Sequence, residues 1–431
     1  MNEKPVLRSD RSVRASYLKT SPNAGAQQEA HYDRVLSFAV CFQISIVGIK
    51  NSLVQGIPEL YNVNSTLNNV LLAIIALVYI WAFLESWNRI GQINISVVLF
   101  SLFLLLSYFA TRILFPENIH VVHEWLPRMV PFYFVTAYMI TNLSSTKWIA
   151  YYMKRFSLVI LFFSVISSVY IYYYGHVTTS TWLAYSMPLS YVTMLAVMWV
   201  LYYYFENHKF YMLAVAVIGI VIIVLYGSRN PLIAIISYVI VKYTRNVFSP
   251  ESGILKKTLF FFSLILLVLG LAFYKNILFS LDDFLKSYNI NSRTLRLMAR
   301  TEMDLTGRSD IHNEIFALMA KQPLLGLGLG GDVQQTGFSS HSLYLSILSA
   351  YGFLFGSALI IAMLICCLKA YLKAERLDRE VLLIYLCLTL PRGFFGGDFS
   401  SSDVLWWMLG ICVVIFNQPS RLNPVKELSV R

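Results

Sequence analysis

Long apolar runs that carry almost no charge constrain this chain more than any other feature. Apart from Arg112, they contain no Asp, Glu, Lys or Arg, and they cover residues 67–84, 97–114, 157–174, 183–205 and 259–273. Each run is close to the roughly 17–25 apolar residues that a helix needs to cross the hydrocarbon core. Strands of a membrane barrel would alternate apolar and polar residues instead. The sequence therefore predicts an all-α polytopic membrane protein.

Composition supports this class. Of the 431 residues, 57% are hydrophobic and 13% are charged, and the mean hydropathy is +0.61. These values exclude an ordinary soluble domain. We predict twelve membrane-spanning helices, near 35–49, 67–84, 94–114, 129–141, 156–174, 183–205, 210–226, 231–248, 258–279, 342–368, 381–391 and 403–417.

The chain divides into segments around these spans. Residues 1–34 are polar and basic without a cleavable signal peptide, so we predict a disordered cytoplasmic tail. Spans 1–9 occupy 35–279, a long extracytoplasmic loop covers 280–341, spans 10–12 occupy 342–417, and 418–431 form a second tail. The five cysteines all lie in apolar spans, where a thiol acts as a small hydrophobe rather than a metal ligand.

The distribution of positive charge predicts the orientation. With the N-terminus inside, most of the 34 Lys and Arg residues fall in predicted cytoplasmic segments. The short outer loops hold only five, which are Lys50, Arg112, Arg128, Arg229 and Arg392. Long loops cross the membrane largely regardless of charge. Both termini are therefore predicted to be cytoplasmic, and the net charge of +11 reflects topology rather than nucleic-acid binding.

Three outer arginines have an unusual setting. Arg128, Arg229 and Arg392 each lie within two residues of a proline at a predicted helix boundary, beside short apolar runs. Helices that end below the membrane surface leave irregular backbone, which survives only inside protein or a wet cavity. A single such arginine would usually be an interfacial anchor. Three such arginines on one side of the membrane indicate a basic binding site for an anion, which we call the cup. The planar guanidinium group of arginine suits a phosphate.

The long loop contains a predicted amphipathic helix. Thr306 or Ser309 can cap a helix that runs to about Ala320. Its apolar residues recur at helical spacing, while Arg308 and His312 lie one turn apart on the other side. We expect this helix to lie on the membrane or on the bundle, with Arg308 pointing into the cup.

Two further loop features are candidates for a site. The glycines of Gly326-Leu327-Gly328-Leu329-Gly330-Gly331 superficially resemble a dinucleotide fingerprint, but the strand that such a motif requires does not precede them. Gly326 and Gly328 would instead let the backbone approach a bulky ligand or pack closely. His341 stands just before a span at the outer face, and an ordinary imidazole pKa near 6.5 suits proton abstraction at neutral pH.

Several short motifs in one order resemble the bacterial O-antigen polymerase and O-antigen ligase superfamily. They are Gly227-Ser228-Arg229, Thr306-Gly307-Arg308-Ser309, Pro323-Leu324-Leu325-Gly326-Leu327-Gly328, His341-Ser342-Leu343-Tyr344 and Tyr351-Gly352. The resemblance covers roughly residues 215–365. Where many members have His-Asn, this chain has His341-Ser342.

The resemblance implies a GT-C-like glycosyltransferase of the bacterial cytoplasmic (inner) membrane. It would move a growing glycan from a polyprenyl diphosphate to a sugar hydroxyl of the next lipid-linked repeat unit, as in lipopolysaccharide O-antigen synthesis. Arg229 and Arg308, aided by Arg128 or Arg392, would stabilise the leaving diphosphate, and His341 would accept the hydroxyl proton. No cofactor and no metal are expected, and a chain-length regulator is an implied partner.

Other functions remain open at the level of sequence. A ligase that uses a lipid A core as acceptor would employ the same donor and the same arginines. A lipid-linked oligosaccharide transporter is a different class, but the two halves of the chain show no internal repeat. A related transferase could instead use a carboxylate base, and Glu59 is the acid available in the first outer loop.

Overall fold

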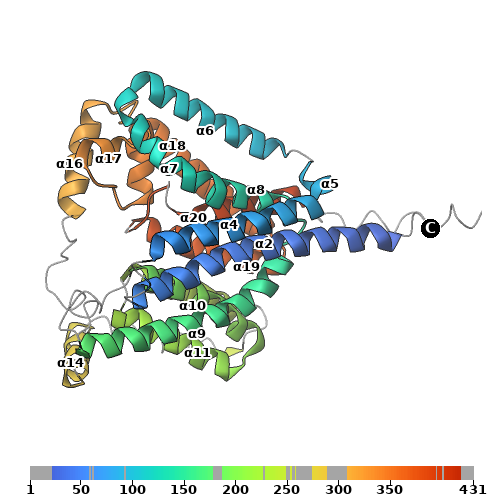
Figure 1. Ribbon diagram of the computed structural model, residues 1–431, viewed down its shortest axis with the longest axis vertical. Helices are drawn as coiled ribbons and strands as arrows, with labels where there is room; N and C mark the ends of the chain where they lie inside the picture. The colour runs from blue at the N-terminus through green and yellow to red at the C-terminus, as the bar shows by residue number, and fades with distance from the viewer. Residues whose placement is uncertain are drawn as a thin grey trace, which may run out of the picture.

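A computed structural model describes most of the chain. The described residues are 22–57, 60, 63–91, 94–177, 187–226, 229–248, 253–254, 258, 274–288, 308–394, 396–399 and 402–418. All regular elements within these ranges are helical (Figure 1). The helices are α2 (Pro22–Gly56), α4 (Asn64–Glu85), α5 (Trp87–Ile90), α6 (Ile95–Leu114), η2 (Pro116–Asn118), α7 (Ile119–Arg128), η3 (Met129–Phe134), α8 (Val135–Thr141), α9 (Lys147–Val177), α10 (Met187–Asn207), α11 (Phe210–Tyr226), α12 (Arg229–Val247), α14 (Tyr274–Ser287), α16 (Arg308–Lys321), α17 (Gly331–Thr336), α18 (Leu343–Lys373), α19 (Arg376–Thr389), η4 (Arg392–Phe394) and α20 (Asp403–Asn417).

The predicted all-helical membrane class is confirmed. Within the described residues, six helices are long and apolar enough to cross a membrane, and they include most or all of α2, α4, α6, α9, α10 and α18. Shorter apolar helices cover Met129–Thr141, Phe210–Leu225 and Asp403–Asn417, where three further spans are predicted. Most of the predicted span 258–279 lies outside the described residues.

Two predicted boundaries differ from the helices observed. α2 begins at Pro22, within the segment predicted to be a disordered tail. Near its start the carboxylate of Asp33 accepts hydrogen bonds from the backbone N–H (2.9 Å) and the hydroxyl of Ser144, which ties this turn to the bundle. α14 passes through residue 280, where a span was predicted to end and the loop to begin.

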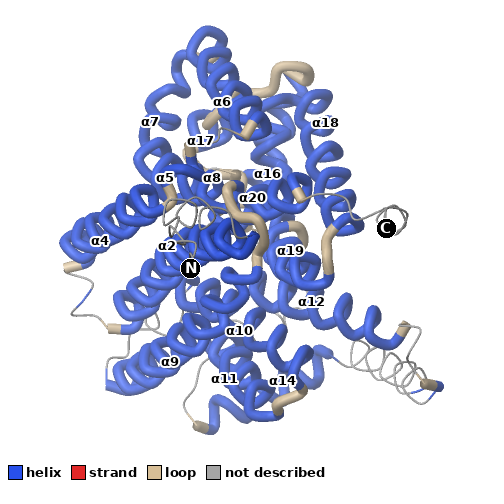
Figure 2. Tube along the Cα trace, turned by 90° about the vertical axis from the view of Figure 1, so that its right-hand side faces the viewer, coloured by secondary structure: helices blue, strands red, loops and turns tan. Residues whose placement is uncertain are grey.

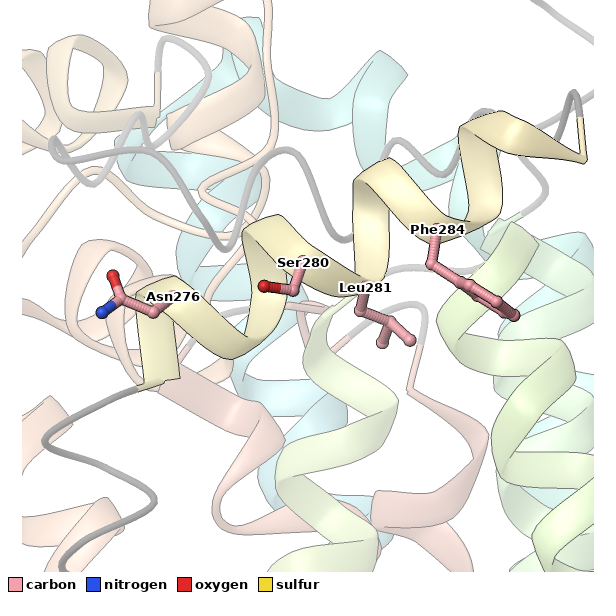
Figure 3. A pocket seen from close by; sticks show the side chains of 4 residues that line it. All are labelled: Asn276, Ser280, Leu281 and Phe284. Atoms are coloured by element: carbon pink, nitrogen blue, oxygen red, sulfur yellow. The ribbon is translucent and has the colours of Figure 1, made fainter.

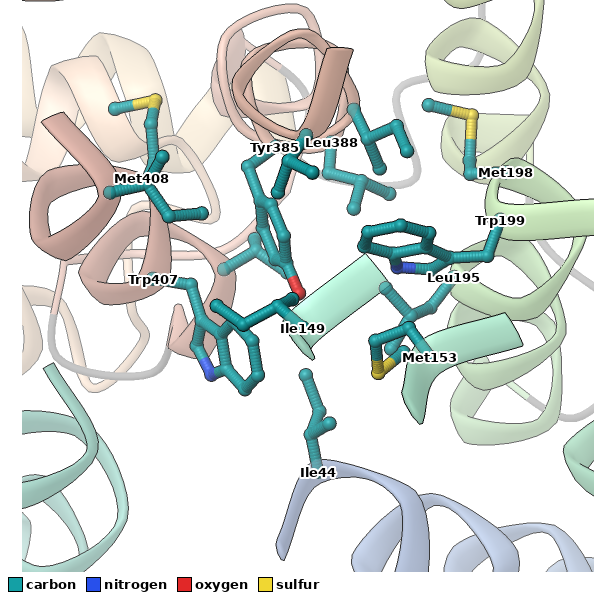
Figure 4. Packing of buried hydrophobic residues seen from close by; sticks show 14 of the residues in the cluster. Ile44, Ile149, Met153, Leu195, Met198, Trp199, Tyr385, Leu388, Trp407 and Met408 are labelled. Carbon is teal, nitrogen blue, oxygen red and sulfur yellow. The ribbon is translucent and has the colours of Figure 1, made fainter. Parts of the chain in front are cut away.

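The core lies where α2, α9, α10, α19 and α20 meet. Figure 4 shows the ring of Tyr385 between Trp199 and Trp407, with ring centroids 6.4 Å and 5.2 Å apart. All three side chains are fully buried. Large aromatic side chains supply much of the apolar area that a core removes from solvent. α6 is different, because its buried residues are Ser107 and Thr111 and many of its apolar side chains are exposed on the outside of the bundle.

The bundle has two distinct ends. α16 and α17 lie at one end, which we call the loop end, and α5 lies at the opposite end (Figure 1). In the perpendicular view of Figure 2, α6 and α7 lie along one edge of the bundle, and α11 and α14 along the other. Polar contacts hold separate segments together at the end opposite the loop end. There, Asp378 accepts hydrogen bonds from Thr146 (2.8 Å to its backbone N) and Gln418 (2.7 Å).

Candidate functional site

Three segments that are distant in sequence meet at the loop end. The hydroxyl of Ser342, just before α18, donates a hydrogen bond to the carbonyl of Gly393 in η4 (3.0 Å). The Tyr344 hydroxyl donates to the carbonyl of Leu390 (2.9 Å), and its ring lies 4.5 Å from that of Phe394. These contacts place the backbone of His341 beside the backbone of Arg392. We call this meeting point the junction.

The start of α12 joins the same junction. Asn230, the second residue of α12, donates a hydrogen bond to the hydroxyl of Tyr191 on α10 (3.4 Å). A Cβ added to Gly396 would lie 2.7 Å from Nδ2 of Asn230 and 3.2 Å from the Tyr191 hydroxyl. Glycine at 396 therefore lets the segment after η4 pack closely on α12. Arg229, adjacent to Asn230, is brought to the junction by this contact.

His341 has an unusual backbone conformation. Its φ is +50°, in the left-handed region that residues other than glycine rarely adopt. The imidazole is exposed, and its Nδ1 lies 3.3 Å from the Ser339 hydroxyl. Strained residues of this kind persist only where the surroundings fix them, and they cluster at functional sites.

The backbone of Ser340, the residue before His341, is held from two sides. Oδ2 of Asp332, in α17, accepts a hydrogen bond from the backbone N–H of Ser340 (3.0 Å). Nε2 of His312, in α16, lies 2.8 Å from the carbonyl oxygen of Ser340. Asp332 is only 4% exposed. Burial raises the pKa of its carboxyl above the usual value, while its hydrogen bonds to backbone N–H groups act in the opposite direction.

The predicted loop helix packs on the bundle. Ile315 and Met319 of α16 are fully buried in one apolar cluster with Leu327 and with Leu345 of α18. The sequence left open whether this helix lies on the membrane or on the bundle, and the contacts with α18 show the second arrangement. The helix starts at Arg308, one turn before His312.

The glycine-rich loop forms a close backbone joint with α18. Gly352 interrupts that helix with φ 77° and ψ 171°. Backbone groups of α18 on either side of the interruption form hydrogen bonds with the glycine-rich loop. The N–H of Leu327 bonds to the carbonyl of Ser349 (2.6 Å), and the N–H of Phe353 bonds to the carbonyl of Pro323 (2.8 Å). The motifs 323–328 and 351–352, which the sequence shows separately, are thus two halves of one structural joint.

Gly326 and Gly328 are both required by this packing. Gly326 has φ +68°, and a Cβ there would lie 2.4 Å from the backbone N of Gly352. Gly328 has φ +75°, and a Cβ would lie 2.6 Å from the Phe115 ring. Of the two roles the sequence allowed, close packing is the one that these contacts show; a role beside the substrate stays a prediction.

The structure places the backbones of the four candidate arginines, while their side chains lie outside what it describes. Arg229, Arg308 and Arg392 are the first residues of α12, α16 and η4, and Arg128 is the last residue of α7. Arg229 and Arg308 therefore stand at the N-termini of α-helices, where the helix dipole itself favours an anion. Glu59, the alternative base, and Thr306 also lie outside the described residues.

Arg128 reaches the same region through α7. Trp125, one turn before it, packs edge-on against Phe399 at a ring distance of 6.0 Å. Phe399 follows η4 closely and its carbonyl accepts a hydrogen bond from Trp406 (3.3 Å). The segment 392–399 thus contacts α7, α12 and α18 together. Sequence reasoning named Arg392 but missed the rest of this segment, although its run Gly393-Phe394-Phe395-Gly396-Gly397 is a signal of close packing.

A shallow pocket lies elsewhere at the loop end. Asn276, Ser280, Leu281 and Phe284 line it, and all four belong to α14 (Figure 3). It does not include any candidate site residue. Among the described residues, no three His, Cys, Asp or Glu side chains cluster as a metal site would require, and metal independence stays an expectation.

Fold and site together define an all-helical membrane protein with an exposed histidine and arginine-bearing helix ends gathered at one end of the bundle. Residues 214–361 match the family described as O-antigen ligase. This match, over about a third of the chain, supports the resemblance to the superfamily of O-antigen polymerases and ligases, whose members are glycosyltransferase-like enzymes. The segment contains Arg229, Arg308 and His341, whereas Arg128 and Arg392 lie outside it. No curated protein matches the chain.

Proposed function

We propose that this protein is a polysaccharide polymerase that builds O-antigen or a similar surface glycan. It would transfer the growing chain from a polyprenyl diphosphate to a sugar hydroxyl of the next lipid-linked repeat unit. The observation that carries the proposal is the junction, where Ser342 and Gly393 are hydrogen-bonded and Asn230 packs against Gly396. These contacts support a shared site for a potential base, His341, and two arginines, Arg392 and Arg229.

The chemistry follows from these groups. The His341 imidazole takes the proton of the acceptor hydroxyl as the oxygen attacks the anomeric carbon of the donor. The bond from that carbon to the diphosphate oxygen breaks, and the diphosphate leaves with the bonding electrons. Arg229 and Arg308, aided by Arg392 and Arg128, stabilise the negative charge that develops. No step in this scheme requires a metal or a cofactor.

The orientation that suits this chemistry puts the loop end outside. Both termini would then be cytoplasmic, and the junction would lie at the depth of the outer headgroups of a bacterial cytoplasmic membrane. The positive-inside distribution supports this arrangement. A reporter fused in the segment 285–335 is expected to be extracytoplasmic, and one fused at 370–378 cytoplasmic.

A ligase is the second candidate. It is favoured by the family description, O-antigen ligase. The donor, the leaving group and the arginines would be the same, and only the acceptor would differ, with a lipid A core in place of the next repeat unit.

One gel distinguishes the two. The gene is deleted from its host and the surface glycans are separated by size. Loss of polymerase leaves single repeat units on the lipid anchor, whereas loss of ligase removes all capped lipid. Accumulation of intermediates on the cytoplasmic side would indicate a transporter and overturn the proposal.

A further inference from the structure

We propose that Asp332 and His312 are positioning residues that hold His341 in its left-handed conformation and thereby aim its imidazole at the acceptor hydroxyl. The inference rests on the proposed function for its activity readout. Its geometry is independent of that function.

Asp332 holds the backbone N–H of Ser340, the residue that precedes His341. Its carboxylate is 4% exposed and accepts the Ser340 N–H at 3.0 Å. A carboxylate is costly to bury unless its oxygens are satisfied, so a buried Asp beside a solvent-facing histidine requires a reason.

His312 holds the carbonyl side of the same residue. Its Nε2 lies 2.8 Å from the Ser340 oxygen, and a carbonyl only accepts, so Nε2 carries the hydrogen. Both backbone polar groups of Ser340 are therefore fixed by side chains from different helices, α17 and α16. Such a double attachment removes the rotational freedom of the backbone just before His341.

Ser340 and Ser342 close the turn around His341. The Ser340 hydroxyl donates to the carbonyl of Ser342 (3.0 Å), which spans His341. Ser342 in turn caps α18 by accepting from the N–H of Leu345 (3.3 Å). With both neighbours fixed, residue 341 must turn with φ +50°. The strain is maintained by the contacts of Asp332 and His312, so removing either contact lets the histidine relax.

Paired substitutions separate positioning from other roles. Asp332→Asn keeps a carbonyl oxygen that can accept the Ser340 N–H, whereas Asp332→Leu removes the acceptor. We expect the polymerisation rate of Asp332→Leu to fall tenfold or more, and that of Asp332→Asn to stay within about threefold of the parent. His312→Gln keeps an N–H donor, so its polymerisation rate should likewise be higher than that of His312→Leu. Asp283→Leu, at a 75% exposed carboxylate on α14, is the matched control and should be unchanged.

A double-mutant cycle tests whether Asp332 acts through His341. In a His341→Ala background, Asp332→Leu should add less than about a twofold loss, because the group that it positions is already absent. A full, multiplicative tenfold loss in that background would overturn the proposal. So would an Asp332→Asn variant as inactive as Asp332→Leu, since that would assign Asp332 a proton or a charge.

A second readout does not depend on glycan chemistry. In His341→Cys protein, the rate of labelling by a membrane-impermeant maleimide reports the exposure of position 341. The parent, with its five native cysteines, serves as the blank. Asp332→Leu should change the labelling rate severalfold and Asp332→Asn should restore it. A fully active His341→Ala variant would contradict the role of His341 as the base, while the labelling rates would still test whether Asp332 positions residue 341. An unchanged labelling rate in Asp332→Leu would contradict the positioning role itself.

Discussion

The Ser342 hydroxyl donates a hydrogen bond of 3.0 Å to the carbonyl of Gly393, which joins two segments 51 residues apart. The same oxygen accepts the N–H of Leu345 and so begins α18. One hydroxyl thus sets the start of the helix after His341 and fixes it to the turn that begins with Arg392. A hydroxyl has one donor and two acceptor lone pairs, so it can do both.

Ser342→Ala should lower stability by about 1–2 kcal/mol, because it removes a helix cap and a buried hydrogen bond. Asn is an equally good cap, and its amide can donate to Gly393, so Ser342→Asn should be close to the parent. Thermal unfolding of the purified protein in detergent measures both. Equal unfolding temperatures for the parent and Ser342→Ala would mean that this bond does not contribute.

Arg229→Ala and Arg308→Ala should each abolish long glycan chains while the protein still inserts and accumulates. In the proposed mechanism each arginine stabilises the negative charge of the leaving diphosphate, and alanine removes that stabilisation. Glycan length on a gel and protein level on a blot are the two measurements. Arg112→Ala, at an exposed arginine in the last turn of α6, is the control and should keep long chains. Parental chain lengths in both site variants would contradict the hypothesis that these arginines bind the diphosphate.

His341→Ala should lower the rate of polymerisation by about a hundredfold or more, as is typical when a general base is removed. His208 provides a close control, since it is also exposed and also has a positive φ, +52°, but lies between α10 and α11. His208→Ala should keep the parental rate. Near-normal activity of His341→Ala would redirect the search to His312, Glu314 or Glu59.

Gly326→Ala should destabilise the protein by about 3 kcal/mol or more, because it combines a strained φ with overlap of backbone atoms that cannot move aside. Gly337 has a similar φ, +74°, but open space around it. Gly337→Ala isolates the conformational cost and should be milder. Thermal unfolding of the two variants gives the comparison, and equal losses would show that the joint with Gly352 adds nothing.

A buried ion network away from the junction provides a separate test. Lys242, 2% exposed, pairs with Glu380 (2.6 Å) and Glu206 (3.0 Å), and Arg245 also pairs with Glu380. Glu380→Leu leaves buried cations with too few partners and should cost about 3–5 kcal/mol. Lys242→Met should cost less, because Arg245 and Arg376 still neutralise the two carboxylates. The reverse order in unfolding experiments would contradict this account.

The network also relates α12 to α19. Lys242 lies 13 residues after Arg229 in α12, so at about 1.5 Å per residue the Arg229 backbone stands roughly 20 Å from it along the helix. Glu380 lies 12 residues before Arg392, which follows the end of α19 at Thr389. Sequence could supply each spacing separately. It could not supply the pairing, because nothing in either helix alone specifies its partner.

What the sequence determined by itself were the local and periodic properties. Apolar runs without charge specify membrane helices, the spacing of Ile315 and Met319 specifies the buried face of α16, and the positive φ values at Gly326 and Gly328 follow from a residue type that allows them. The candidate histidine and arginines could also be named, since a polar residue is conspicuous where its neighbours are apolar.

Only the tertiary structure decided which of these features meet. The bond from Ser342 to Gly393, the packing of Asn230 on Gly396, and the attachment of Ser340 by Asp332 and His312 all join residues from different helices. Such contacts arise when apolar faces pack and bring polar groups together that must then satisfy one another away from water. That requirement acts through space rather than along the chain, so no local pattern records it.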